Sequence, residues 1–394
     1  MKRIYLDYAA TTPTHPEVMK EMLPFFNQIY GNPSSIYQLA QRAKGAVEEA
    51  RKKVAELINA KPEEIIFTSG GTEADNLAIK GVAWANKKKG NHIITSKIEH
   101  HAVLNTCKWL EKQGFKVTYI SVDKYGIINL DELKDSLTDK TILISIMHAN
   151  NEVGTIQPLL EISKIAQRRG IYFHTDAVQT VGKVPTDVKE SGVDLLSLSG
   201  HKLYGPKGVG ALYIRKGVKV LPLIHGGHHE RNKRAGTENV PGIVGLGKAC
   251  ELAAREMATE RRKLKMLRDR LYKGLSEQIE DIVLNGHPQN RLPGNLNICV
   301  KYVEGESMLI NLDLEGICAS SGSACTSGSL EPSHVLLAMG IPPEIAHGSL
   351  RFSLGRDTTE KEIDRVIEVL PPIVKKLRAM SPFGKKIKSG EYRG

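Results

Sequence analysis

The sequence predicts an α/β fold with two domains, a large one built on a mainly parallel sheet of seven strands and a smaller α+β one. Three observations predict it. The 394 residues exceed the size of roughly 250 to 300 residues at which a single core stops growing. Between about residues 60 and 215, short apolar runs alternate with helical stretches. Polar residues follow the ends of several of these runs, where open α/β sheets bind ligands.

Seven apolar runs define the predicted sheet. They cover residues 64–68, 92–95, 117–120, 141–146, 171–175, 194–199 and 210–214. Because the runs are short and apolar, we expect these strands to be buried on both faces.

The second half of the chain has a different pattern. Residues 251–280 predict a long amphipathic helix, with leucines at spacings of three and four, namely Leu264, Leu267, Leu271 and Leu275. Strand-like segments at 292–300 and 349–354 and a helix over 360–380 follow. We therefore expect a large domain over 15–255 and a small domain formed by 1–14 with 256–384, while the polar tail 385–394 should be poorly ordered.

Composition excludes several classes of function. The net charge is +11, but no nucleic-acid-binding motif accompanies it, so a direct nucleic-acid partner is not expected. Apolar runs are too short to span a membrane, and the start lacks the features of a signal peptide, which predicts a cytoplasmic protein. Five scattered cysteines predict free thiols, and the paired histidines lack the partners that an intrinsic metal site needs.

Three strand ends carry residues that suit one cofactor. Gly70 and Gly71 open a helix whose free N–H groups could hold a phosphate. Asp176 ends the fifth run and Lys202 follows the sixth. Alone, they would be read as a connecting turn, a helix cap and a surface cation. Together they match pyridoxal 5'-phosphate, which needs a phosphate cup, a carboxylate for its pyridinium and a Schiff-base lysine.

The chain resembles the cysteine desulfurases of the NifS/IscS type, which are class V aminotransferase-like enzymes of fold type I. The resemblance runs nearly end to end. Its motifs include Thr68-Ser-Gly-Gly-Thr-Glu-Ala-Asp-Asn, Glu99-His-His-Ala-Val, Asn150-Asn-Glu-Val-Gly, Thr175-Asp-Ala-Val-Gln, Ser199-Gly-His-Lys-Leu-Tyr-Gly-Pro-Lys-Gly, Arg234-Ala-Gly-Thr-Glu-Asn and Ser320-Ser-Gly-Ser-Ala-Cys-Thr-Ser-Gly.

The resemblance implies a role for each matching residue. It makes Lys202 the Schiff-base lysine, Asp176 the pyridinium partner, Gln179 a donor to the ring hydroxyl and His100 a catalytic imidazole stacked on the ring. The implied phosphate ligands are Gly71, Thr72, Ser199 and His201, with Thr237 reaching across from the other subunit of a homodimer. Asn151 and Arg351 would hold the carboxylate of L-cysteine, and Asn151 also lies among the implied cofactor-binding residues.

Cys325 is the implied sulfur acceptor. It lies in a run of small polar residues, at about 320–332, which predicts a mobile loop. The resemblance implies that L-cysteine becomes alanine while its sulfur forms a persulfide on Cys325. The sulfur would then pass to an iron–sulfur scaffold protein of the IscU/NifU type, with Cys325 as a transient iron–sulfur ligand. The other cysteines, Cys107, Cys250, Cys299 and Cys318, are expected to be small buried side chains.

Two rival hypotheses fit part of these observations. An aminotransferase or selenocysteine lyase would share the cofactor residues, although Cys325 in its loop argues against an aminotransferase. A non-catalytic protein that docks an iron–sulfur assembly partner would keep the basic surface, but the complete set of Lys202, Asp176, His100 and Cys325 favours catalysis. Housekeeping and nitrogen-fixation roles both remain open.

Overall fold

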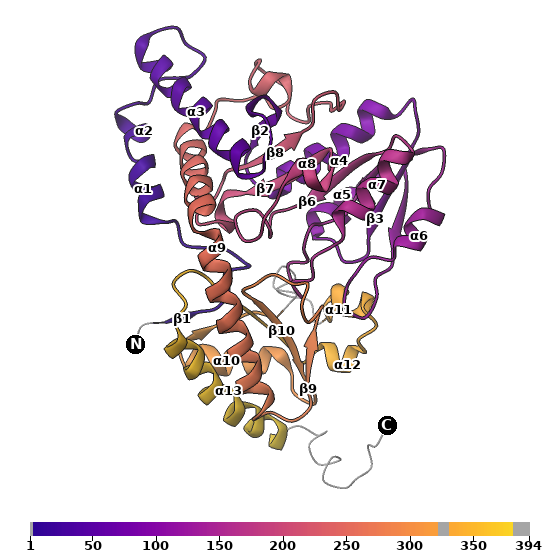
Figure 1. Ribbon diagram of the computed structural model, residues 1–394, viewed down its shortest axis with the longest axis vertical. Coiled ribbons are helices and arrows are strands. Elements are labelled where there is room, and N and C mark those ends of the chain that lie inside the picture. Colours follow the sequence, from indigo (N-terminus) through magenta and orange to yellow (C-terminus); the bar gives the residue numbers. More distant parts are fainter. Residues whose placement is uncertain (1–2, 322–330, 381–394) are drawn as a thin grey trace.

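The computed structural model describes residues 3–321 and 331–380 and has two bodies joined by one long helix (Figure 1). The upper body contains a seven-stranded sheet with the order β2-β8-β7-β6-β5-β3-β4. Its strands are β2 (Ile65–Thr68), β3 (His92–Ser96), β4 (Lys116–Ile120), β5 (Thr141–Ser145), β6 (Tyr172–Asp176), β7 (Leu195–Ser199) and β8 (Gly210–Ile214). All seven predicted strands are confirmed, within one or two residues.

The sheet is mainly parallel, as predicted, but the expected burial of every strand on both faces is wrong for β4. β8 runs antiparallel to both of its neighbours, β2 and β7, while the remaining pairs are parallel. β4 is not buried on both faces, because it lies at the edge of the sheet and Lys116 at its start is exposed. An edge strand has a neighbour on one side only, so it tolerates polar residues.

Helices cover both faces of this sheet. Neighbouring residues of β2 belong to different cores, since Ile65 and Phe67 pack with α3 (Gln38–Leu57) and the first half of α9, whereas Ile66 packs with α4 (Gly71–Asn86). Side chains alternate between the faces of a strand, so these two cores lie on opposite sides of the sheet. α5 (His101–Glu111) packs on the α4 side, and α7 (Leu159–Arg168) packs on the α3 side.

The lower body has its own core around two small sheets. β12 (Ser349–Ser353), β10 (Asn295–Val300) and β9 (Ile282–Asn285) form an antiparallel sheet, and β1 (Ile4–Tyr5) pairs with β11 (Ile317–Cys318) in parallel. The predicted C-terminal helix is confirmed as α13 (Glu360–Met380). The remaining helices are α1 (Pro16–Met22), α2 (Pro24–Asn27), α6 (Leu130–Asp135), α8 (Val188–Ser191), α10 (Gly305–Leu314), α11 (His334–Ala338) and α12 (Pro343–Ala346).

α9 (Val240–Ser276) connects the two cores. It begins 11 residues before the predicted start at 251, because Asn239 caps it through a bond from the Gly242 N–H. Its first half is buried in the upper core, and its leucines at 264, 267, 271 and 275 pack in the lower one. Among the described residues, no helix is both long and apolar enough to cross a membrane.

Candidate active site

The carboxyl ends of the parallel strands meet at a cavity of about 320 Å³. Ten of the predicted site residues line it, namely Gly71, Thr72, His100, Asn151, Asp176, Gln179, Ser199, His201, Lys202 and Arg351. Thr237 does not line it and is exposed on the segment that precedes α9. The predicted nucleophile Cys325 lies outside the described residues.

The glycine turn after β2 is shaped by close contacts. Gly70 has φ +153°, which favours glycine, and a Cβ at Gly71 would lie 2.7 Å from Cγ2 of Val178. α4 begins at Gly71, so the N–H groups of its first turn lack helical partners and face a potential anion. A carboxylate fixes this turn, because Glu73 accepts the Ser69 N–H at 2.8 Å and pairs with Arg234 at 2.9 Å.

Lys202 is held over the cavity by the N-terminal segment. It lies in the short helix Gly200–Lys202 directly after β7. Its Nζ donates to the carbonyl oxygens of Ala9 at 2.5 Å and Ala10 at 2.7 Å. Thr12 secures the same segment, since its N–H donates to the His201 carbonyl at 2.9 Å. No role for residues 9–12 was predicted from the sequence. Ala9 and Ala10 act through their main-chain carbonyls, which the identity of the side chain does not indicate.

Asp176 is a buried carboxylate at the end of β6. Its Oδ1 accepts the Val178 N–H at 2.9 Å. Burial raises its pKa, while His100, this hydrogen bond and Lys202 act in the opposite direction. A buried carboxylate stays ionised only beside a cation, so the position suits a protonated ring nitrogen.

His100 caps α5 with its imidazole. Its Nδ1 accepts the Ala102 N–H at 3.1 Å. Burial lowers its pKa, so the ring is neutral, and a neutral ring that accepts at Nδ1 carries its proton on Nε2. In this tautomer the ring can donate at Nε2, but it cannot take a proton there from a substrate thiol.

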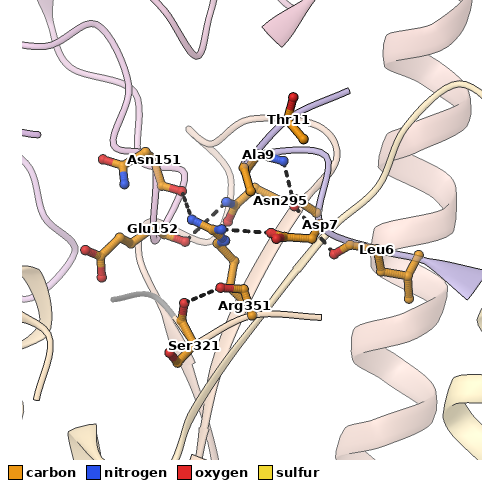
Figure 2. Close-up of polar contacts among 12 residues, drawn as sticks. Leu6, Asp7, Ala9, Thr11, Asn151, Glu152, Asn295, Ser321 and Arg351 are labelled. Atoms are coloured by element: carbon orange, nitrogen blue, oxygen red, sulfur yellow. Dashed lines mark hydrogen bonds and ion pairs between the residues drawn. The ribbon is translucent and has the colours of Figure 1, made fainter. Parts of the chain in front are cut away.

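Arg351 enters the cavity from the lower body, on β12. Figure 2 shows its guanidinium between Asp7 and the main chain of Asn151, with NH2 donating to Asp7 Oδ1 at 2.8 Å and NH1 donating to the Asn151 carbonyl at 3.0 Å. Among the described residues, the buried Nε has no hydrogen-bond partner. The Asn151 side chain does not contribute to this contact, and Asp7 was not among the predicted site residues.

One further charged side chain that lines the cavity was not predicted. Asp75, one helical turn after Gly71, lines the cavity, is buried and lies 3.6 Å from Nε2 of His174. The i, i+4 spacing from Gly71 was the available signal.

Among the four described cysteines, Cys107, Cys250 and Cys299 are buried as expected, but Cys318 is partly exposed because it lies on the two-stranded sheet.

The chain is similar to known proteins over nearly its whole length. The aminotransferase class-V family matches residues 4–366. A cysteine desulfurase IscS of Methanosarcina thermophila is 61% identical over 392 residues, covering 100% of this chain and 96% of the relative. A solved NifS-like protein superposes with a TM-score of 0.90 at 41% identity, covering 95% of this chain and 100% of its own. The solved structure of SspA in complex with cysteine has a TM-score of 0.80 at 38% identity, covering 89% and 99%.

The fold and the strand-end site define the class as the fold-type I, pyridoxal-phosphate-dependent enzymes of the class-V type. Within that class, the chain belongs to the cysteine desulfurase family.

Proposed function

We propose that this chain converts L-cysteine to L-alanine and moves the sulfur to Cys325 as a persulfide. The observation that carries the proposal is that one cavity is lined by Lys202, Asp176 and Arg351. A nucleophilic amine, a buried carboxylate and a carboxylate-binding guanidinium are the groups that an amino-acid-converting enzyme with this cofactor needs. The solved complex of SspA with cysteine, a structural relative, supports the same substrate.

The residues present fit pyridoxal 5'-phosphate. The start of α4 with Ser199 and His201 would hold the phosphate, Asp176 the ring nitrogen and Lys202 the aldehyde. Burial, with repulsion from Lys202, lowers the pKa of His201 to about 4, so this histidine is neutral before a phosphate binds. When bound, the cofactor supplies an electron sink that stabilises the charge left at the substrate α-carbon when its proton departs.

The protein groups around the substrate have separate tasks. Arg351 would bind the substrate carboxylate through its guanidinium, beside Asp7. Lys202 Nζ would move the α-proton, and His100, which lines the same cavity, would donate a hydrogen bond at Nε2. The C–S bond of the substrate breaks as its sulfur bonds to the Cys325 thiolate, and one proton from the two thiols ends on alanine. Thiol and substrate thus give persulfide and alanine without an external oxidant or reductant.

We infer that the enzyme acts as a homodimer. Thr237 is exposed away from the cavity of its own chain, which suits a role at the phosphate of a partner subunit. Large apolar side chains near the N-terminus are also exposed, including Phe26, Tyr30 and Ile36. Sedimentation of the purified protein should give twice the chain mass, and a monomer would contradict the inference.

The acceptor of the persulfide sulfur is proposed to be an iron–sulfur scaffold protein of the IscU/NifU type.

The proposed conversion of L-cysteine is tested by measuring the release of sulfide and alanine with a reductant present. Wild type should release both in equal amounts, and Cys325→Ala should keep its cofactor colour and release neither. Full activity in Cys325→Ala would contradict the persulfide step and favour a lyase. Incubation with a purified scaffold protein, without reductant, should move the sulfur onto that protein.

A further inference from the structure

Lys183 is a lysine beside the cavity that the proposed reaction does not use. Its Nζ donates to Oε1 of Gln179 at 3.0 Å. Nε2 of the same amide donates to the Ala9 carbonyl at 2.9 Å, and that carbonyl also accepts from Lys202 at 2.5 Å. A continuous path of hydrogen bonds therefore joins Lys183 through Gln179 to the carbonyl that holds Lys202.

This contact fixes the orientation of the Gln179 amide. An amide side chain offers an acceptor on one side and two donors on the other, and the two orientations have nearly the same shape. An amine of lysine that points its N–H groups at the amide selects the oxygen, so Oε1 must face Lys183. The amide nitrogen consequently faces the N-terminal segment, where it donates to the Ala9 carbonyl, and Gln179 also lines the cavity.

Charged groups from several elements surround Lys183. Burial lowers its pKa to about 7, and repulsion from Lys202 and Arg351 acts in the same direction, while Glu260 of α9 opposes them. His201 also faces it and is itself affected by this charge. Glu260 is engaged by the Tyr204 hydroxyl at 2.9 Å, and among the described residues no carboxylate forms an ion pair with Lys183. A buried amine without an ion pair lowers the stability of the fold. Its presence is therefore better explained by a role at the site than by a contribution to stability.

We propose that Lys183 is a positioning residue that orients the Gln179 amide, so that its N–H faces the ring hydroxyl of the bound cofactor. The inference rests on the proposed function, since it assigns Gln179 to the same cofactor. Without Lys183, only the Ala9 carbonyl still selects the amide orientation, so the amide turns more readily and can present its oxygen to an oxygen of the cofactor. The interaction then becomes repulsive instead of attractive.

The test is a double-mutant cycle on cofactor affinity. Protein freed of cofactor is titrated with pyridoxal 5'-phosphate, followed by visible absorbance, for wild type, Lys183→Met, Gln179→Ala and the double variant. Lys183→Met should raise Kd about fivefold, the value of one hydrogen bond. In the Gln179→Ala background the same change should alter Kd less than about twofold, because the partner is already absent.

A matched control and a spectrum complete the design. Lys189→Met removes an exposed lysine that contacts Asn59 on the surface, and Kd should stay within about twofold of wild type. In Lys183→Met the visible band should titrate at a higher pH, since a cation and an oriented donor are both lost.

Three outcomes would overturn the inference. One is an unchanged Kd in Lys183→Met. Another is an equal loss with and without Gln179, which is also what a general folding defect would give. If wild type itself binds no pyridoxal 5'-phosphate, the proposed function fails and the inference fails with it.

Discussion

The two walls of the cavity are built in different ways. The wall that we call the cofactor wall comprises Gly71, Thr72, His100, Asp176, Ser199 and Lys202, which lie at or just beyond the ends of four strands of one sheet. The substrate wall comprises Asn151 and Arg351, together with Asp7, which pairs with Arg351 but does not itself line the cavity; these hydrogen bonds join residues 344 and 200 positions apart. The first wall follows from one sheet, whereas the second exists only when both bodies and the N-terminal segment are in place.

The difference predicts that the walls can be damaged separately. Changes in the cofactor wall should alter cofactor binding and the chemical step together. Changes in the substrate wall should leave the cofactor bound and weaken only the capture of L-cysteine. Substitutions in and around the two walls test this separation, beginning with the largest expected effect.

Lys202→Ala should abolish function most completely. Because Lys202 would both hold the cofactor and move the α-proton, alanine formation should fall by at least about 10³-fold. Absorbance and turnover should be lost together in this variant, while circular dichroism reports an intact fold. If Lys202→Ala still forms alanine at a tenth of the wild-type rate, the assignment of Lys202 as the residue that moves the α-proton is wrong.

Arg351→Lys tests the substrate wall. A lysine keeps the charge but cannot form the two-pronged contact of a guanidinium, so KM for L-cysteine should rise about 100-fold. The affinity for pyridoxal 5'-phosphate should remain that of wild type, because Arg351 belongs to the other wall. Loss of the cofactor from this variant would show that the two walls are not separable.

His100→Asn separates catalysis from stability within the cofactor wall. Asparagine can replace the Nδ1 acceptor that caps α5, so the free energy of unfolding should change by less than about 0.5 kcal/mol. The ring and its Nε2 donor are lost, and kcat should fall about 30-fold. Steady-state kinetics and denaturant unfolding measure kcat and the free energy of unfolding on one sample. A loss of kcat accompanied by a comparable loss of unfolding free energy would contradict the catalytic assignment of His100.

Glu99→Gln should have the smallest effect on turnover, and its effect should appear in the dependence of stability on pH. Burial raises the pKa of Glu99 from 4.5 to about 8, so the folded protein prefers the protonated carboxyl. This preference is fully present below pH 4.5 and is lost as the pH rises toward 8. Relative to Glu99→Gln, wild type should therefore lose on the order of 5 kcal/mol over that range, since each pH unit contributes about 1.4 kcal/mol. If the difference in unfolding free energy between wild type and Glu99→Gln is the same at the low and the high end of this pH range, the prediction is wrong.

The two walls could be predicted from the sequence to unequal extents, for physical reasons. Strands β2 to β8 have short apolar runs with polar ends, a local signal that identifies the sheet and, in the cofactor wall, Gly71, Asp176 and Lys202. The resemblance supplied Thr72, His100 and Ser199. Asp7 and the carbonyls of Ala9 and Ala10 acquire their roles only through contacts distant in sequence. Local periodicity holds no information about such contacts. The Arg351 assignment came from resemblance alone, and its pairing with Asp7 required the structure.

Helix boundaries show the same limit. The start of α9 was predicted 11 residues too late, because its first turns are small and apolar rather than amphipathic, with Gly242, Gly245 and Gly247 among them. A helix buried on all sides has no polar face to reveal its period. The later half, with one buried stripe of leucines, was predicted correctly.

The most direct test of the persulfide reaction is a single turnover without reductant. Enzyme loaded with pyridoxal 5'-phosphate is mixed with excess L-cysteine, quenched, digested and analysed by mass spectrometry, while alanine is counted in the same sample. We predict one alanine and one added sulfur atom for each chain, with the sulfur on the peptide that contains Cys325. Alanine formed in the same amount without added sulfur on Cys325 would contradict the persulfide mechanism.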